Sequence, residues 1–250
     1  MKEESLLLLS DLQKLINQVV LIDYTIIILG GHIMLQIGIR EPGSAITHFI
    51  AMMMAIFATS PLLVKAALNG NHTTILAMAV FMGSMVLLYG ASTVYHSLVV
   101  RDKILKIFRK LDHMMIFVLI AGSYTPVCLI VLGGKSGYTL LAAVWGIAAA
   151  GMLIKVLWIN CPKWFSSVIY IAMGWVCLFV FRELLATLSQ AAFLWLLAGG
   201  LIYTVGGVIY ALKLPVFNAK HSQFGSHEVF HLFVMAGSIC HFVFMYQYVA

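Results

Sequence analysis

The sequence predicts an all-α integral membrane protein built as a bundle of seven transmembrane helices. Of its 250 residues, 62% are hydrophobic and only 10% are charged, whereas a soluble domain usually carries about 25% charged residues. The mean hydropathy is +1.02. The apolar stretches are continuous, unlike the alternating pattern of a membrane β-barrel strand. Each stretch reaches the ~20 residues that a helix needs to cross a bilayer.

Seven apolar segments follow one another from Ser44 onward. Turn-forming residues separate them, as in Asn69-Gly70-Asn71, Gly133-Gly134-Lys135 and Asn160-Cys161-Pro162. No internal repeat or second domain is visible, so we expect residues 40–250 to form one domain. The predicted spans are Ala45–Leu68, Thr74–Leu98, Met114–Leu132, Tyr138–Ile159, Phe165–Phe181, Ala191–Leu212 and Val229–Tyr248.

The first 39 residues form a separate N-terminal extension. Met1–Asp23 mixes a leucine run with charged residues, which predicts an amphipathic surface helix. Val19–Ile39 is apolar enough for marginal insertion only, because Asp23 and His32 are costly inside a bilayer. The extension lacks the basic start and the cleavage site of a signal peptide. We expect residues 1–39 to be accessory, or the part before Met34 to come from a misplaced start codon.

Lysine and arginine residues predict the orientation. Five of them lie in a predicted loop after the second span, between Arg101 and Lys110. The positive-inside rule therefore places the N-terminus in the cytoplasm and the C-terminus outside. This loop is a topology signal, with contact to anionic lipids as the alternative. The net charge of +6 then needs no acidic partner, and the absence of an aromatic-basic stripe argues against nucleic-acid binding.

The four cysteines predict no disulfide and no cysteine-based metal site. They are scattered, mostly within apolar segments, and none forms a CxxC pair. We expect them to pack as small hydrophobic residues. They are Cys128, Cys161, Cys177 and Cys240.

Polar residues gather near one end of three predicted spans. Ser92 and His96 lie at the end of the second span and, being four residues apart, share a helix face. Asp112 begins the third span, and His227 and His231 share a face at the start of the seventh. The predicted orientation places all five at the cytoplasmic side. Ionisable groups within membrane spans are costly, which favours a functional role.

Three histidines and one water make a four-coordinate zinc site with an open position. Zinc in such a site can lower the pKa of its bound water to about 7. His227–His231 also spells the H-E-x-x-H string of zinc proteases, but five residues match by chance and that motif normally lies in a soluble helix. The alternative is that each histidine separately contacts water or lipid headgroups at the membrane interface.

The remaining histidines fit a shared site less well. His241 lies ten residues beyond His231, about 15 Å further along a helix, and cannot bind the same ion. His113 points about 100° away from its neighbour Asp112. His48 belongs with a polar network on the first span. The two predicted loop residues are His72 and His221.

Five stretches of the chain resemble the bacterial hemolysin III proteins, which belong with the progestin and adipoQ receptors, including the adiponectin receptors. The resemblance covers about Arg40 to Ala250 and implies seven helices with a cytoplasmic N-terminus. It implies a zinc ion held by three histidines, an aspartate that reaches the zinc through a water, and a serine beside it. The stretches are Glu41–His48, Ser92–Ser97, Lys110–His113, Ala121–Pro126 and His227–His231. The residues at the implied positions are His96, His227 and His231 for zinc, Asp112 for the aspartate and Ser92 for the serine.

The resemblance implies a zinc-dependent hydrolase of lipid amides such as ceramide-like acyl amides. Zinc would polarise the carbonyl and supply hydroxide, Asp112 would act as general base and then acid, and Ser92 would hydrogen-bond the water or the oxyanion. Membrane lipids are the expected partners, in a multi-pass protein of the bacterial plasma membrane. Residues 1–39 do not resemble the long cytoplasmic region of adiponectin-type members, so we expect no peptide hormone.

Two other functions stay open. The first is a pore-forming or cytolytic protein, the function behind the family's name, although no ring of charge or amphipathic pore-lining helix appears across several spans. The second is a non-catalytic module in membrane lipid homeostasis, stabilised by zinc. Structural zinc is usually coordinated by four protein ligands. A set of three histidines therefore favours a catalytic site, in which one coordination position is open.

Overall fold

The computed structural model describes residues 24–29, 32–212 and 225–250. Seven of its helical segments are long and apolar enough to cross a membrane, which confirms the predicted bundle. The principal helices are α2 (Pro42–Asn69), α3 (His72–Ser97), α4 (Asp102–Pro126), α5 (Gly134–Leu157), α6 (Lys163–Gly174), α8 (Gln190–Leu212) and α10 (Ser226–Phe244). The shorter elements within or beside the spans are η1 (Val127–Leu132), η2 (Val176–Val180), α7 (Phe181–Thr187) and η3 (Met245–Val249).

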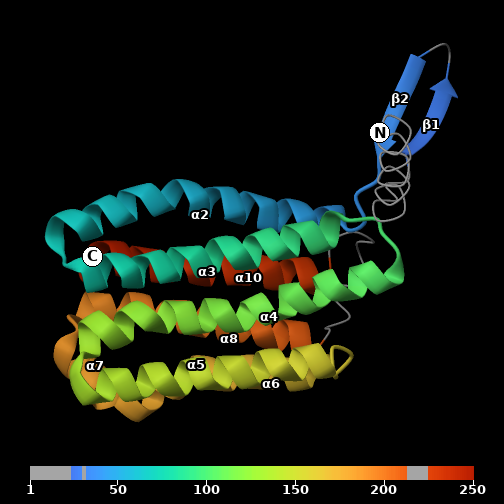
Figure 1. Cartoon of the computed structure of the whole chain (residues 1–250). Helices are drawn as coiled ribbons and strands as arrows, with labels where there is room; N and C mark the ends of the chain where they lie inside the picture. Colours follow the sequence, from blue (N-terminus) through green and yellow to red (C-terminus); the bar gives the residue numbers. More distant parts are fainter. Residues whose placement is uncertain (1–23, 30–31, 213–224) are drawn as a thin grey trace, which may run out of the picture.

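The seven spans pack side by side in sequence order, and the last contacts the first (Figure 1). Helix α3 packs against both α2 and α4 and is the most buried span. Helix α10 packs against α8 and α2, which closes the ring. The outward faces carry many exposed large apolar side chains, as a lipid-facing surface requires. Consecutive spans run in opposite directions, so the end of α3 and the start of α10 lie at the same end of the bundle (Figure 1).

The third span begins earlier than the sequence predicted. We expected a loop from Arg101 to Lys110 and a span from Met114, but α4 begins at Asp102. Lysine and arginine are good helix formers, and Ile104, Ile107 and Phe108 supply apolar side chains at helical spacing. A fall in hydropathy marks the edge of the bilayer, not the end of the helix. The basic residues from Lys103 to Lys110 therefore lie on the first turns of α4, Arg101 is the residue before the helix, and Asp112 lies within it.

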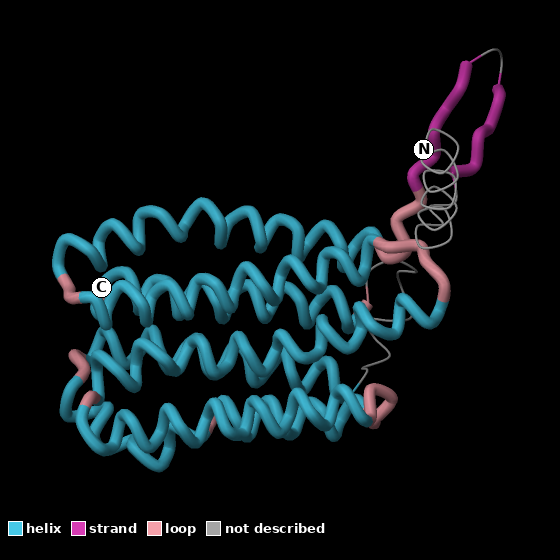
Figure 2. The backbone as a smooth tube through the Cα atoms, in the orientation of Figure 1, coloured by secondary structure: helices cyan, strands magenta, loops and turns pink. Residues whose placement is uncertain are grey.

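A two-stranded antiparallel hairpin precedes the bundle (Figure 2). Strands β1 (Tyr24–Leu29) and β2 (His32–Ile37) pair along their full lengths. The described residues of Val19–Ile39, the segment judged apolar enough for marginal insertion only, therefore form strands and not a helix. The cause is a β-branched run around Ile26 to Ile28, which favours strands. The amphipathic helix expected over residues 1–23 lies outside the described residues.

The fifth span is broken in its middle, where α6 ends and η2 begins. Broken helices are tolerated inside a membrane where neighbouring groups satisfy the freed backbone. Here the Tyr124 hydroxyl donates to the Gly174 carbonyl oxygen at 2.6 Å and accepts from the Cys177 backbone N–H at 3.0 Å. In the same motif, Thr125 Oγ1 accepts from Trp145 Nε1 at 3.2 Å. The Ala121–Pro126 stretch therefore joins α4 to its neighbours.

Close packing of α4 against α5 depends on a glycine. A Cβ atom added at Gly151 would lie 2.2 Å from a ring carbon of Phe117, a fully buried side chain. We expect Gly151→Ala to destabilise the protein by about 1–3 kcal/mol through overpacking. Gly146→Ala on the same helix is the control, because nothing lies within 4 Å of its added Cβ. Thermal unfolding in detergent checks this: equal midpoints for the two variants would contradict it.

Candidate metal centre

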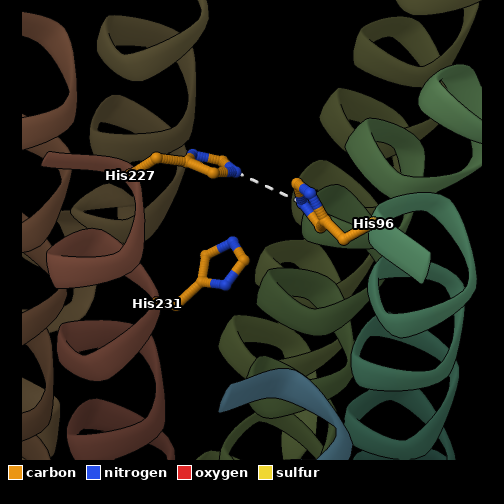
Figure 3. Close-up of side chains that lie close together, drawn as sticks. All are labelled: His96, His227 and His231. Carbon is orange, nitrogen blue, oxygen red and sulfur yellow. Dashed lines mark hydrogen bonds between the residues drawn. The ribbon is translucent and has the colours of Figure 1, made fainter. Parts of the chain in front are cut away.

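Three histidines from two helices lie together at one end of the bundle. His96 is in the last turn of α3, and His227 and His231 are in the first two turns of α10. One ring nitrogen from each lies within 4.8 Å of the other two. Figure 3 shows the three rings around a common space between the helices. The structure therefore brings together the three histidines that the sequence singled out.

The spacing of the ring nitrogens fits a tetrahedral metal ion. His96 Nε2 and His227 Nε2 are 3.2 Å apart (Figure 3). Two nitrogen ligands held ~2.0–2.1 Å from a tetrahedral zinc would be roughly 3.3 Å apart. All three rings are close enough to be in contact, with centroids 4.5–5.2 Å apart. His96 and His231 are almost fully buried. Three imidazoles in a largely buried site are a donor set typical of zinc.

Glu41 orients His96. Its carboxylate contacts His96 Nδ1, and this hydrogen bond lowers the pKa of Glu41 below its usual value. Because a carboxylate only accepts hydrogen bonds, Nδ1 carries the proton and the lone pair of Nε2 is left for a metal. The backbone N–H of Glu41 also donates to the His96 carbonyl oxygen at 3.0 Å, and Arg40 donates to the Tyr95 carbonyl at 2.8 Å. The residues before α2 therefore cap the end of α3 and fix its last histidine.

His231 is held from helix α2. The Thr47 hydroxyl lies 3.2 Å from His231 Nδ1, within hydrogen-bond distance. The ring of His48 stacks on that of His231 with centroids 3.5 Å apart and planes 8° from parallel. His48 is therefore a packing partner of the three-histidine group. Neither of its ring nitrogens has a hydrogen-bond partner among the described residues, so the expected polar network of His48 is not found there. With Nδ1 held by Thr47, Nε2 of His231 is the nitrogen available to an ion.

Glu228 serves as a tether, which separates this site from that of the H-E-x-x-H proteases. One carboxylate oxygen accepts from Ser44 Oγ at 2.5 Å, and the other accepts from the Gly225 backbone N–H at 2.8 Å. These bonds cap the start of α10 and join it to α2. Glu228 is absent from the lining of the cavity beside the histidines. Glu228 therefore does not take the place of the catalytic glutamate of that motif.

Ser92 and Asp112 lie beside the histidines in the wall of one internal cavity. The cavity has a volume of about 190 Å³, and both residues line it together with His48, His227 and His231. Ser92 Oγ is buried next to Asp112 and has no hydrogen-bond partner of standard geometry among the described residues. Asp112 is buried and is not among the mutually close ligand atoms. Both therefore face space that a water or a ligand group can occupy.

The other histidines stay outside the ligand group, as their spacing predicted. His241 is buried deeper along α10, against Gly199 and the ring of Tyr203. His113 lines the cavity but offers no ligand atom to the three-histidine group. His72 is the first residue of α3 and not a loop residue, because Asn71 caps that helix by accepting from the Thr74 backbone N–H. His221 lies outside the described residues.

The cysteines are free in the structure, in agreement with the sequence. Cys128 and Cys161 are buried, and Cys177 and Cys240 are partly buried. None belongs to the three-histidine group. Sequence reasoning did not assign the roles of Glu41 and Thr47. The position of Glu41 directly before a span, within a stretch that already carried the family resemblance, was the available signal.

We expect Glu41→Gln to weaken metal binding by about 10–100-fold, the usual cost of losing a carboxylate that orients a histidine ligand. The amide keeps the size of the side chain but no longer imposes the proton on His96 Nδ1. Competition with a metal-chelating dye measures the affinity. Glu183→Gln, an exposed glutamate on α7, is the control. Equal affinities for the two variants would contradict this role of Glu41.

This fold and site define a class of protein, namely seven-helix membrane proteins with a buried three-histidine group. The model of the family described as "Haemolysin-III related" matches residues 38–242, and the chain belongs to this family. It is 37% identical to Hemolysin-3 of Bacillus cereus over 84% of this chain and 92% of that protein. It is also 37% identical to the Hemolysin-3 homolog of Bacillus subtilis, over 81% and 91% of the two chains.

Similarity extends more weakly to eukaryotic receptors. The adiponectin receptor protein of Drosophila melanogaster is 24% identical over 81% of this chain and 49% of its own length. The progestin and adipoQ receptor-like protein 1 of Caenorhabditis elegans is 26% identical over 81% and 50%. The resemblance drawn from the five sequence stretches is therefore confirmed at the level of family and superfamily. The chain is a multi-pass protein of the cell membrane.

Proposed function

We propose that this protein is a zinc-dependent hydrolase that cleaves the acyl amide bond of a ceramide-like membrane lipid near the cytoplasmic face. The observation that carries the proposal is the three-histidine group, which opens beside a mostly apolar cavity containing Ser92 and Asp112. The reaction consumes one water and releases a fatty acid and an amine. Zinc, when bound, supplies Lewis-acid polarisation of a carbonyl and makes a bound water more acidic.

The three histidines bind and orient, and the fourth position is left for water or substrate. His96 and His231 are each fixed through Nδ1, by Glu41 and Thr47 respectively, so their Nε2 atoms are directed inward. Since three protein ligand atoms lie within reach of one another among the described residues, the set matches the three-ligand arrangement of catalytic zinc sites. This favours catalysis over a purely structural role.

Asp112 moves the proton in this proposal. A carboxylate oxygen of Asp112 takes a proton from the attacking water and returns it to the leaving amine nitrogen. Ser92 Oγ, buried without a standard hydrogen bond, donates to the developing oxyanion. The apolar lining of the cavity, which includes Leu88, Ile116 and Val234, accommodates the acyl chain and excludes water from the reacting bond.

Acyl release from a panel of ceramide-like amides by the purified protein tests this function. We expect release by the wild type and its loss in Ser92→Ala by about 10²–10³-fold, the cost of one oxyanion donor. Ser97→Ala at the end of the same helix is the control. Release that survives complete removal of zinc would contradict the proposal. Dye leakage from liposomes without any acyl release would favour the pore-forming alternative.

A further inference from the structure

Lys155, in the last turn of α5, is the single buried lysine or arginine in the part of the chain that the structure describes. Its side chain is 2% exposed. Lysines near the ends of membrane helices normally extend their ammonium groups to the water interface. Lys155 instead turns inward, where it lines the cavity of the histidine site. An inward lysine is unnecessary for orienting the protein, since exposed cations such as Lys106 serve that purpose.

The direct hydrogen-bond partners of this ammonium group are neutral. Nζ donates to Ser166 Oγ at 2.5 Å and lies 3.2 Å from Cys161 Sγ. The ring of Tyr170 lies 5.7 Å from Nζ. Within the described ranges no carboxylate forms an ion pair with it. Burying a charged ammonium without a counter-charge costs free energy, and an anion bound beside it would offset that cost.

The surrounding cavity wall carries an excess of positive charge. Arg109 and Lys163 line the same cavity as Lys155, and the described residues of its lining include one carboxylate, Asp112. Arg109 acts electrostatically on Asp112, whereas Lys155 has no carboxylate partner among the described residues. The guanidinium of Arg109 is also 3.3 Å from the side-chain oxygen of Asn160, a neutral partner. An anion entering here would meet a preformed set of charged and hydroxyl donors.

The rest of the cavity is apolar and larger than a simple ion needs. A single water occupies roughly 10–15 Å³ on the same scale, whereas this cavity measures about 190 Å³. Its walls include Ile120, Leu119 and Leu197. A ligand that fills both regions must combine an anionic head with an alkyl chain. Inorganic phosphate would satisfy the charge but would leave the apolar part unfilled.

We propose that Lys155, with Ser166 and Arg109, forms a binding site for the oxyanion of an amphipathic lipid, a phosphate or carboxylate head whose alkyl chain lies in the cavity. The site recognises the negative charge of its ligand, and this binding depends neither on a metal nor on amide hydrolysis. Lys155 and Ser166 fix the anionic head through charge-assisted hydrogen bonds. The histidines lie elsewhere in the same wall, so a bound anionic amphiphile competes with other lipids for the cavity.

Equilibrium binding of dodecyl phosphate to the purified protein in neutral detergent tests this site. Dodecanoate, dodecanol and inorganic phosphate are the comparison ligands. We expect the two alkyl anions to bind and dodecanol and inorganic phosphate to bind at least tenfold more weakly. Lys155→Met should weaken dodecyl phosphate binding by roughly 10–100-fold, the loss of a hydrogen bond to a charged group. Lys155→Arg keeps the charge and should retain binding.

Lys106→Met, which removes an exposed cation at the same end of the bundle, should leave binding unchanged. Protein stripped of metal with a chelator should also bind dodecyl phosphate normally, which separates this site from the proposed zinc chemistry. Unchanged circular dichroism shows that Lys155→Met is folded. Ser166→Ala should weaken binding several-fold as a second, milder variant. Equal affinity of wild type and both Lys155 and Ser166 variants, or equal affinity for dodecyl phosphate and inorganic phosphate, would overturn the proposal.

Discussion

Replacing His231 by alanine is expected to strip the metal from the purified protein. In the proposed site His231 contributes one of the three ligand nitrogens found among the described residues, and its removal would leave His96 and His227 to hold the ion. Two ligands bind a metal far more weakly than three, so the loss should exceed the roughly 10–100-fold cost of a change in an orienting residue. Metal content per chain, measured on protein purified without chelator, reports the result.

His241→Ala is the matched control for this variant. His241 lies on the same helix, α10, and is also buried, but it is outside the three-histidine group. It should retain the metal of the wild type. Loss of metal in both variants would indicate a general effect of disturbing α10 and would contradict the assignment of the ligands.

Replacing Asp112 by asparagine is expected to abolish most acyl release while the metal stays bound. Asparagine has nearly the same shape as aspartate but cannot take up and return a proton. A general acid–base residue typically contributes about 10²–10⁴-fold to the rate, and we expect a loss in this range. The measurement is the initial rate of acyl release, together with metal content, for the same preparation.

Asp102→Asn is the control for Asp112, because Asp102 is exposed at the start of the same helix. Its rate should equal that of the wild type. If Asp112→Asn keeps its full rate, Asp112 does not transfer the proton. If it loses metal together with its rate, Asp112 holds the metal centre in place and is not the acid–base group.

The sequence predicted the spans well because hydropathy and helix length are local properties. It missed the true start of α4, since a membrane boundary and a helix end need not coincide, as the basic turns from Asp102 onward show. It also missed the hairpin of β1 and β2, where a marginally apolar segment was weighed only as a helix. The break after Gly174 was invisible because it depends on Tyr124, from another helix.

Much of the site could be predicted because burying its ionisable side chains in apolar membrane segments costs free energy. His96, His227 and His231 stand out in apolar segments, and topology alone brings their helix ends together. The contacts that orient the three histidines could not be predicted from a single sequence. Thr47 and His231 are 184 positions apart, and no local pattern links them. Lys155 resembled other cations at helix ends, and only its burial distinguishes it.

X-ray absorption at the zinc edge of the purified protein tests the central claim most directly, namely that one zinc is held by three histidines. We expect one zinc per chain, with three imidazole nitrogens at about 2.0–2.1 Å and one further oxygen ligand. His231→Ala should remove this signal. Sulfur ligands at about 2.3 Å, or protein that binds no zinc when it is supplied, would contradict the account.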